Sequence, residues 1–199
     1  MNSTCILLFS LAVGGILAAQ ENASKAKATS SQSFAPGGTV RMHLSPGAYE
    51  IVGADSKSVV VTYTTNTEEQ LKRVKVQIKA NGPEAELSIH NSPHNNFHAT
   101  IEVPSRSDLW VRLGAGDLNV SNVEGNKDIE NHAGDIDIRI PHPEEYGPRD
   151  ASVTAGDIDA SAFEVSKGGL FRSFHQLGPG KYKLHVHVGA GDVTLSATK

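Results

Sequence analysis

Apolar and polar residues alternate along most of the chain beyond residue 33, with a period of two residues. The segment KYKLHVHV at 181–188 places a tyrosine and three aliphatic residues on one side and two lysines and two histidines on the other. The segments 39–44, 74–80, 86–90 and 100–104 alternate in the same way. Strict alternation is typical of strands that are buried on one face, so we expect a protein built almost wholly from β-strands.

Glycine and proline residues separate the alternating segments and predict turns, as in SPGAY at 45–49 and LGPGK at 177–181. One segment, TEEQLKR at 67–73, favours a helical turn. The chain therefore reads as a series of short strands with one brief helical interruption.

One motif, Ala-Gly-Asp followed by an aliphatic residue, occurs four times. Its copies are GAGDLN at 114–119, HAGDID at 132–137, TAGDID at 154–159 and GAGDVT at 189–194. Glycine adopts a positive φ without penalty, and aspartate can hydrogen-bond the backbone two residues on, so each copy predicts a turn between two strands. The predicted turn glycines are Gly116, Gly134, Gly156 and Gly191.

A unit this short cannot bury its own apolar face, so the copies must stack on one another. The intervals between copies vary, and the longest excursions lie at 141–150 and 163–180. We therefore predict an all-β strand-repeat solenoid or β-roll, similar to a β-helix, in a single domain at 34–199. Within this domain the Gly-Asp repeats occupy 106–199, and a more irregular N-terminal β region occupies 34–105.

The first twenty residues differ from the rest of the chain. An uncharged apolar run at 5–19 ends in small residues and is too short to span a bilayer of roughly 30 Å comfortably. We expect residues 1–19 to be a secretory signal peptide, although no lysine or arginine precedes the run; a buried N-terminal strand or an uncleaved anchor is the alternative. The polar stretch 20–33 is then a flexible lead-in.

Cleavage would remove Cys5, the only cysteine, and would leave a mature chain without a thiol, a disulfide or a transmembrane segment. This predicts an exported protein that is periplasmic, attached to the cell surface or secreted. The net charge is −4 and no run of lysine and arginine occurs. These features argue against nucleic acid or an anionic membrane surface as the main partner.

Two segments, 34–61 and 100–138, carry a resemblance to a known family. They contain PGAYEIVG at 46–53, a Val-Pro pair at 103–104 and serial Gly-Asp-aliphatic strands. Over roughly 34–195 the chain resembles the DUF4097 family of β-strand-repeat proteins, which are labelled adhesins, although alanine stands where serine often precedes Gly-Asp. The resemblance implies an exported, all-β, solenoid-like or β-roll protein of bacterial envelopes, and it brings no catalytic residues.

The first candidate site consists of the turn aspartates Asp117, Asp135, Asp157 and Asp192, with Asp137 and Asp159 two positions further on. Stacked turns would bring equivalent carboxylates within about 5 Å, where they repel one another and would attract Ca²⁺. The alternative is that each aspartate holds its own turn and points into solvent. A pair of carboxylates that cleaves polysaccharide is a third interpretation, but the sequence singles out no such pair.

Histidines supply a second set of candidate ligands. His90, His94 and His98 are four residues apart, but a proline between the first two excludes a helix and leaves only a site on a loop. His185 and His187 share one strand face and could chelate Zn²⁺, but the sequence identifies no third ligand. Solvated turns and a polar outer strand face are the simpler interpretations.

Few aromatic residues are present, and three of them are candidates for binding. Trp110 alternates with Leu109 and Val111, so it points to the opposite face, where it either stacks on a ligand or is covered by the N-terminal strands. Phe171 and Phe174 form either a cap over an open end of the strand stack or a binding tip, and repeat arrays need their ends closed.

The sequence contains no Gly-x-Ser-x-Gly elbow, no phosphate-binding glycine motif and no His-Glu-x-x-His motif. The leading hypothesis is an exported, non-catalytic, adhesin-like binding or structural protein of the cell envelope, whose ligand is a protein or a polysaccharide. We expect no cofactor other than Ca²⁺. The alternatives are a secreted carbohydrate-active enzyme on a β-helical scaffold and an envelope sensor or scaffold protein.

Overall fold

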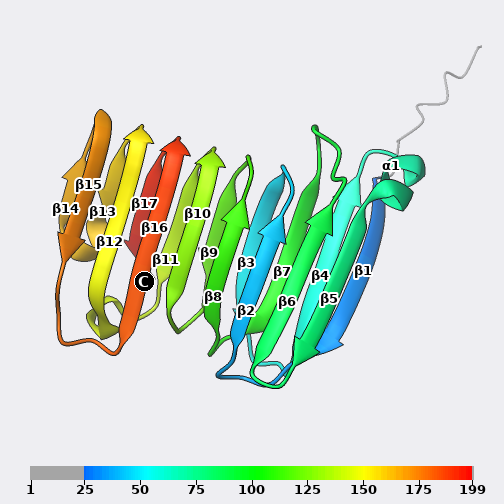
Figure 1. Ribbon diagram of the computed structural model, residues 1–199, viewed down its shortest axis with the longest axis horizontal. Coiled ribbons are helices and arrows are strands. Elements are labelled where there is room, and N and C mark those ends of the chain that lie inside the picture. The colour runs from blue at the N-terminus through cyan, green and yellow to red at the C-terminus, as the bar shows by residue number, and fades with distance from the viewer. Residues whose placement is uncertain (1–24, 199) are drawn as a thin grey trace, which may run out of the picture.

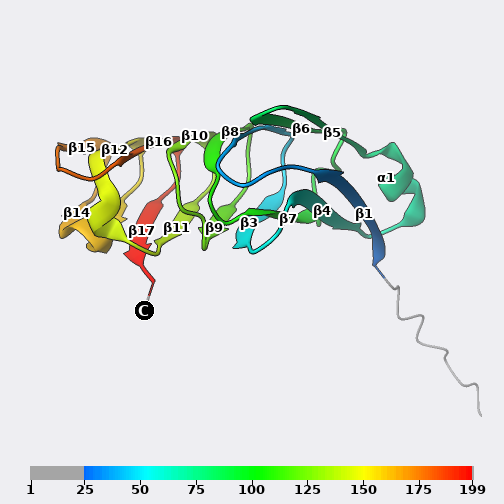
Figure 2. The ribbon, with the colours of Figure 1, turned by 90° about the horizontal axis from the view of Figure 1, so that it is seen from below.

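The computed structural model describes residues 25–198, which form two β-sheets packed face to face (Figures 1 and 2). Figure 2 shows the two layers edge-on, with α1 (Glu68–Arg73) and the N-terminal strands at one end and the strands of residues 165–176 at the other. The predicted signal peptide at 1–19 lies outside the described residues. No helix within the described residues is long and apolar enough to cross a membrane.

The described residues form one nine-stranded sheet and one eight-stranded sheet. Sheet A has the spatial order β1 (Ala26–Ser33), β4 (Ser58–Thr65), β7 (His98–Pro104), β3 (Ala48–Ala54), β9 (Leu118–Ser121), β11 (Ile136–Ile140), β17 (Val193–Ala197), β13 (Ile158–Ala160) and β14 (Val165–Lys167). Sheet B has the order β15 (Leu170–Gln176), β12 (Tyr146–Ala155), β16 (Tyr182–Ala190), β10 (Lys127–Ala133), β8 (Asp108–Leu113), β2 (Thr39–Leu44), β6 (Glu84–His90) and β5 (Lys75–Asn81). The predicted all-β class is confirmed.

Helical structure is scarce and lies in connections. The predicted helical turn at 67–73 is α1, where the Thr67 hydroxyl accepts the backbone N–H of Gln70 and so satisfies one free donor of the first turn. Two short 3-10 helices span Pro143–Glu145 and Ser161–Phe163.

The interior of both sheets repeats one two-strand unit, in which a strand of sheet B passes through a turn into a strand of sheet A. In space the units follow the order β6–β7, β2–β3, β8–β9, β10–β11, β16–β17 and β12–β13. Neighbouring units pair in parallel in both sheets, for example β10 with β16 and β11 with β17. The copies of the repeat therefore stack, but not in chain order, because the C-terminal unit lies between two earlier ones.

Antiparallel strands complete the two ends of the stack. At one end β4 and β1 extend sheet A and β5 extends sheet B; at the other end β14 and β15 each pair antiparallel with the last two-strand unit. Both sheets of the described chain thus remain open, with free edge strands and no closed barrel.

Two expectations about the N-terminal half were wrong. Residues 26–33 of the expected flexible lead-in form β1, which pairs with β4 along its whole length, with Ala26 buried and Ala28 packed against the core. Residues 34–105 are not an irregular region, since β2 and β3 pair in parallel with the first repeat unit, β6 and β7 pair in parallel with β2 and β3, and β4 and β5 add antiparallel strands. Strict alternation in this half was sufficient to build regular strands without the Gly-Asp turn.

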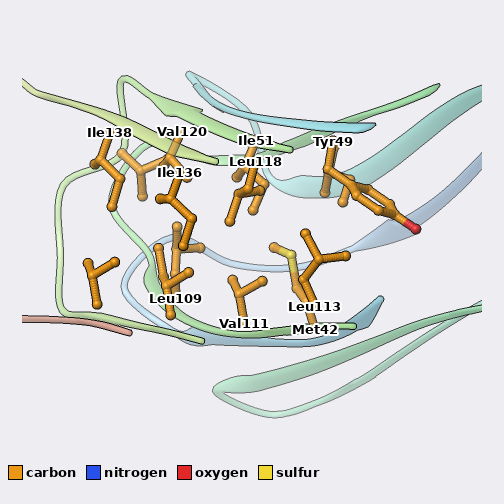
Figure 3. Close-up of a cluster of buried hydrophobic side chains, with 14 of the residues drawn as sticks. Met42, Tyr49, Ile51, Leu109, Val111, Leu113, Leu118, Val120, Ile136 and Ile138 are labelled. Carbon is orange, nitrogen blue, oxygen red and sulfur yellow. The ribbon is translucent and has the colours of Figure 1, made fainter. Parts of the chain in front are cut away.

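The core is the layer of aliphatic side chains between the sheets (Figure 3). From sheet B, residues such as Met42, Val111 and Leu113 point toward residues of sheet A such as Ile51 and Ile138, and all are at most 1% exposed. Burying each such side chain stabilises the fold by roughly 1.5–3 kcal/mol. Because successive side chains of a strand point to opposite faces, every second residue lies on an outer face. The two outer faces therefore carry most of the polar and charged side chains.

Candidate functional site

The four turn aspartates line one edge of the molecule, where sheet B passes into sheet A. Their spatial order is Asp117, Asp135, Asp192 and Asp157, and all four are exposed. In each of the first three, Oδ1 accepts the backbone N–H of the next aspartate, over 3.2, 2.9 and 2.8 Å in that order. The last, Asp157, accepts the N–H of Gly169 at 3.0 Å. We call this row the aspartate ladder.

The glycine before each aspartate lets neighbouring turns approach closely. Gly134 has a φ of 110°, and a Cβ built on it would lie 2.3 Å from the carbonyl oxygen of Gly116. Its own N–H donates to Ala190 O at 2.8 Å, and the N–H of Ile136 donates to Asp192 O at 2.9 Å. Backbone and carboxylate groups therefore form a continuous hydrogen-bond chain from turn to turn.

In the aspartate ladder, one oxygen of each carboxylate accepts a hydrogen bond from a backbone N–H of the next turn. Each of these carboxylates therefore has a structural role. The described residues contain one group of at least three converging metal-type ligands, and the ladder is not part of it. Asp137 and Asp159 lie on the outer face of sheet A, each paired in register with Thr194. Calcium binding by the ladder stays a prediction.

Trp110 stands at the centre of the outer face of sheet B, because its neighbours Leu109 and Val111 face the core. The Arg112 guanidinium carbon lies 3.9 Å from the centroid of its ring, and that of Arg41 lies 5.6 Å away. The His43 ring meets it edge-on at 5.0 Å between centroids. We call Arg41, His43, Trp110 and Arg112 the tryptophan cluster; β1 does not cover it, since that strand belongs to the other sheet.

A row of charged groups continues from the tryptophan cluster across the same face. Arg112 Nη2 lies 2.9 Å from Asp128 Oδ1 and 3.1 Å from Glu130 Oε1, both on the neighbouring strand β10. On the next strand, β16, His185 Nδ1 lies 2.9 Å from Asp150 Oδ1 of β12. The row thus links four parallel strands through side chains that are all partly exposed.

Two hollows open on the surface near these groups. One, of about 310 Å³, adjoins the tryptophan cluster and is lined by Arg41, His43, Lys79, Asn81, Glu84, Ala85 and Glu86. The other, of about 440 Å³, lies at the start of the aspartate ladder, and its lining includes His94, His98 and Asp117. Of the three histidines considered from the sequence, His90 ends β6 and is not among the lining residues of this second hollow.

Phe171 and Phe174 separate into different environments. Phe174 is buried under the end of the stack, whereas Phe171 is 79% exposed and lies on the edge strand β15. The interpretation as an end cap therefore applies to Phe174, whereas the Phe171 ring is exposed to solvent.

Lys127 is a buried cation inside the molecule, 1% exposed. Its Nζ donates to Val123 O at 2.8 Å and to the hydroxyl of Tyr146, which in turn donates to Gly125 O at 2.9 Å. Burial lowers the Lys127 pKa to about 7, and burial also raises the Tyr146 pKa above its usual range. Because Lys127 is enclosed by the core, its role is to satisfy backbone carbonyls of the turn before β10.

Sequence reasoning missed the partners of the exposed histidine His185. Alternation in KDIENHA at 127–133 does assign Asp128 and Glu130 to an outer face. However, β10 and β16 are neighbours in space although 48 residues of other structure separate them in the chain. Such an adjacency follows from the order of strands in the sheet, for which the local sequence holds no signal.

No protein-family model matches the sequence. No curated protein matches it either. Among solved structures, the chain is similar to a candidate cell adhesion protein from Clostridium sporogenes ATCC 15579, with 16% identity, a TM-score of 0.53, and coverage of 87% of this chain and 100% of that one. A candidate adhesin from Bacteroides fragilis NCTC 9343 gives 11% identity, coverage of 86% and 98%, and a TM-score of 0.39. The first similarity shows a shared all-β fold.

Proposed function

We propose that this protein is a non-catalytic, adhesin-like binding protein exported to the bacterial cell envelope. The observation that carries the proposal is the tryptophan cluster, which holds an indole ring and two guanidinium groups on the open face of sheet B. Tryptophan and arginine are the side chains that most often dominate binding energy at interfaces. The ligand that fits such a surface is a protein or a polysaccharide of the envelope.

The cluster is held in place before any ligand arrives. Arg112 is fixed between Asp128 and Glu130, and it stacks on Trp110. Side chains that are already ordered lose less conformational entropy on binding. The adjoining hollow of about 310 Å³ offers room for a side group of the ligand next to Arg41 and His43.

The fold supports the same class of function. One solved structure with a similar all-β fold is described as a candidate cell adhesion protein. We further propose that the chain is a strand-repeat protein of the DUF4097 type with a β-roll architecture, which the stacked two-strand units and their four Gly-Asp turns support.

Export is tested by expressing the full chain in a bacterium, fractionating the cells and measuring the mass of the purified protein. The apolar run at 5–19 predicts protein outside the cytoplasm that begins near Gln20. Full-length protein retained in the cytoplasm would contradict the export part of the proposal and leave the binding part open to its own test.

Binding is tested with isolated envelope polysaccharide and with envelope proteins as separate ligands. Trp110→Ala should weaken retention about tenfold or more, which is typical of the loss of a central tryptophan. Phe171→Ala is the matched control, because it removes an exposed aromatic ring from the far end of the same sheet. Equal binding by wild type and Trp110→Ala, or a loss confined to Phe171→Ala, would overturn sheet B as the binding surface.

A further inference from the structure

Asp128, Glu130 and His185 converge on the outer face of sheet B. One ligand atom from each lies within 4.8 Å of the other two. They come from adjacent parallel strands, with Asp128 directly opposite His185 in register and Glu130 two residues further along β10. We propose that these three side chains form a binding site for a divalent transition metal, with Zn²⁺ as its representative ion; the site does not depend on the function proposed above.

A carboxylate on the next strand holds the ring of His185 in place. Its Nδ1 lies 2.9 Å from Asp150 Oδ1, so this carboxylate accepts the Nδ1 proton and leaves Nε2 with its lone pair. Histidines that bind metals generally donate their second ring N–H to a carboxylate or a carbonyl, which fixes the tautomer and the ring. Asp150 therefore acts as a positioning residue for His185.

Asp128 already forms an ion pair at the same place, through an oxygen that accepts no hydrogen bond. Asp128 Oδ1 is buried and has no hydrogen-bond partner among residues 25–198; Arg112 Nη2 lies 2.9 Å away, outside hydrogen-bond geometry. The charge of this oxygen is balanced by a guanidinium that makes no directed hydrogen bond to it, so a divalent cation can compete for the same oxygen. A metal bound to Asp128 and Glu130 would replace their ion pairs with Arg112.

The ligand set selects the class of metal. One imidazole nitrogen with two carboxylates suits Zn²⁺, whereas Ca²⁺ and Mg²⁺ prefer oxygen ligands alone. The three side chains are 44–45% exposed, so they have the freedom to move closer to the bond lengths of about 2.0–2.2 Å that Zn²⁺ requires. Three protein ligands leave the fourth position of a tetrahedral ion open to water or to a donor from another molecule.

The neighbouring Arg112 provides a readout. Its guanidinium bridges Asp128 and Glu130 and stacks 3.9 Å from the centroid of the Trp110 ring. A metal ion competes with this guanidinium for the same carboxylates, so binding should shift Arg112 and change the fluorescence of Trp110. Trp110 is the only tryptophan in the chain, so the signal is unambiguous.

The test is a titration of the full chain with Zn²⁺ at neutral pH, followed by tryptophan fluorescence and by calorimetry. We expect a saturable, one-to-one binding curve in both. His185→Gln should weaken binding by about tenfold or more, and Asp150→Asn by about tenfold, the loss typical of an orienting partner. Circular dichroism melting of each variant verifies that it is folded.

His187→Gln is the matched control. His187 lies on the same face of the same strand, but its Nδ1 is bonded to Ser152 Oγ at 2.9 Å and it is outside the ligand group. This variant should bind Zn²⁺ as the wild type does. Absence of saturable binding up to millimolar Zn²⁺, or equal losses in the folded His185→Gln and His187→Gln variants, would overturn the proposal.

Discussion

At Gly134, two separate constraints act on one residue. Its φ of 110° is outside the regions that L-residues populate, and the carbonyl oxygen of Gly116 fills the space where a Cβ would stand. Gly82 has only the first constraint in a mild form, since its φ is 58° and nothing lies within 4 Å of its Cβ position. The two glycines therefore separate backbone strain from close packing.

Gly134→Ala should lower the free energy of unfolding by about 3 kcal/mol, the sum of a strained backbone and an overpacked contact. Gly82→Ala should cost about 1 kcal/mol, because it adds only left-handed strain. Chemical denaturation of both variants measures the difference. Equal losses would mean that the close contact between turns contributes nothing.

Lys127 shows how a buried charge sets the pH dependence of stability. Its pKa is about 7 in the folded protein and about 10.5 when the side chain is exposed to water. Between these values the unfolded chain holds more protons than the folded one, so the free energy of unfolding rises with pH. Below pH 7 both states are protonated, and the folded state carries the cost of a buried cation.

Lys127→Met should remove this dependence. We expect the wild-type free energy of unfolding to increase relative to that of Lys127→Met as the pH rises from 7 to 10.5. Denaturation curves at several pH values within that window, taken on both proteins, give the comparison. Parallel profiles would show that Lys127 titrates normally in the folded state.

At the scale of the element, the aspartate ladder connects successive turns by hydrogen bonds from backbone N–H groups to carboxylates. The neighbouring strands are connected by hydrogen bonds between backbone groups. Asp192 is an interior member, accepting the N–H of Asp157 while its own N–H donates to Asp135. Asp192→Ala should cost about 1 kcal/mol, the usual net worth of one hydrogen bond. Asp192→Asn keeps the accepting oxygen and should stay within about 0.5 kcal/mol of wild type in thermal or chemical unfolding. An equal loss in both variants would show that the negative charge matters rather than the acceptor.

A calcium site along the ladder predicts a different behaviour. Millimolar Ca²⁺ should raise the melting temperature relative to excess chelator, because a ligand stabilises the state that binds it. The rise should disappear in Asp135→Asn, which keeps the turn hydrogen bond but removes a charged ligand. An unchanged melting temperature in the wild type would leave the aspartates with their turn role alone.

The strands themselves could be predicted from the sequence, because a period of two reports directly which residues face the core. Alternation placed Trp110 outward, and the Gly-Asp motif located the connection between the two strands in the four units that contain it. Alternation did not predict β1 at residues 26–33, because this segment contains only small and polar residues and shows no clear apolar period of two. Lys127 and Asn131 fall on the inward face by the same alternation, but a lysine and an asparagine are not read as core residues.

At the scale of the whole molecule, the C-terminal unit β16–β17 is interior rather than terminal. β16 pairs with β10 on one side and with β12 on the other. Sequence reasoning could not predict this order, since any of the repeated units offers the same alternating face to a neighbour. The Asp128, Glu130 and His185 group depends on that order and was equally out of reach.

Hydrogen exchange tests the interior position of β16. Its amides should exchange as slowly as those of β8 and β10, because both of its edges are paired, whereas the edge strand β15 should exchange faster. Mass spectrometry of deuterated peptides resolves the three strands. Exchange in β16 at the rate of β15 would mean that the C-terminal unit opens independently.

The interior position of β16 also determines when, during synthesis, the two sheets can be completed. Ribosomes make proteins from the N-terminus, so β12 waits for its parallel neighbour until residues 182–190 have been synthesised, and β13 waits for β17 until residues 193–197 have followed. Until then the two halves of each sheet cannot join, and apolar strand faces stay uncovered. The unit β12–β13 is therefore completed only by strands that follow it in the chain, so its folding lags behind its own synthesis.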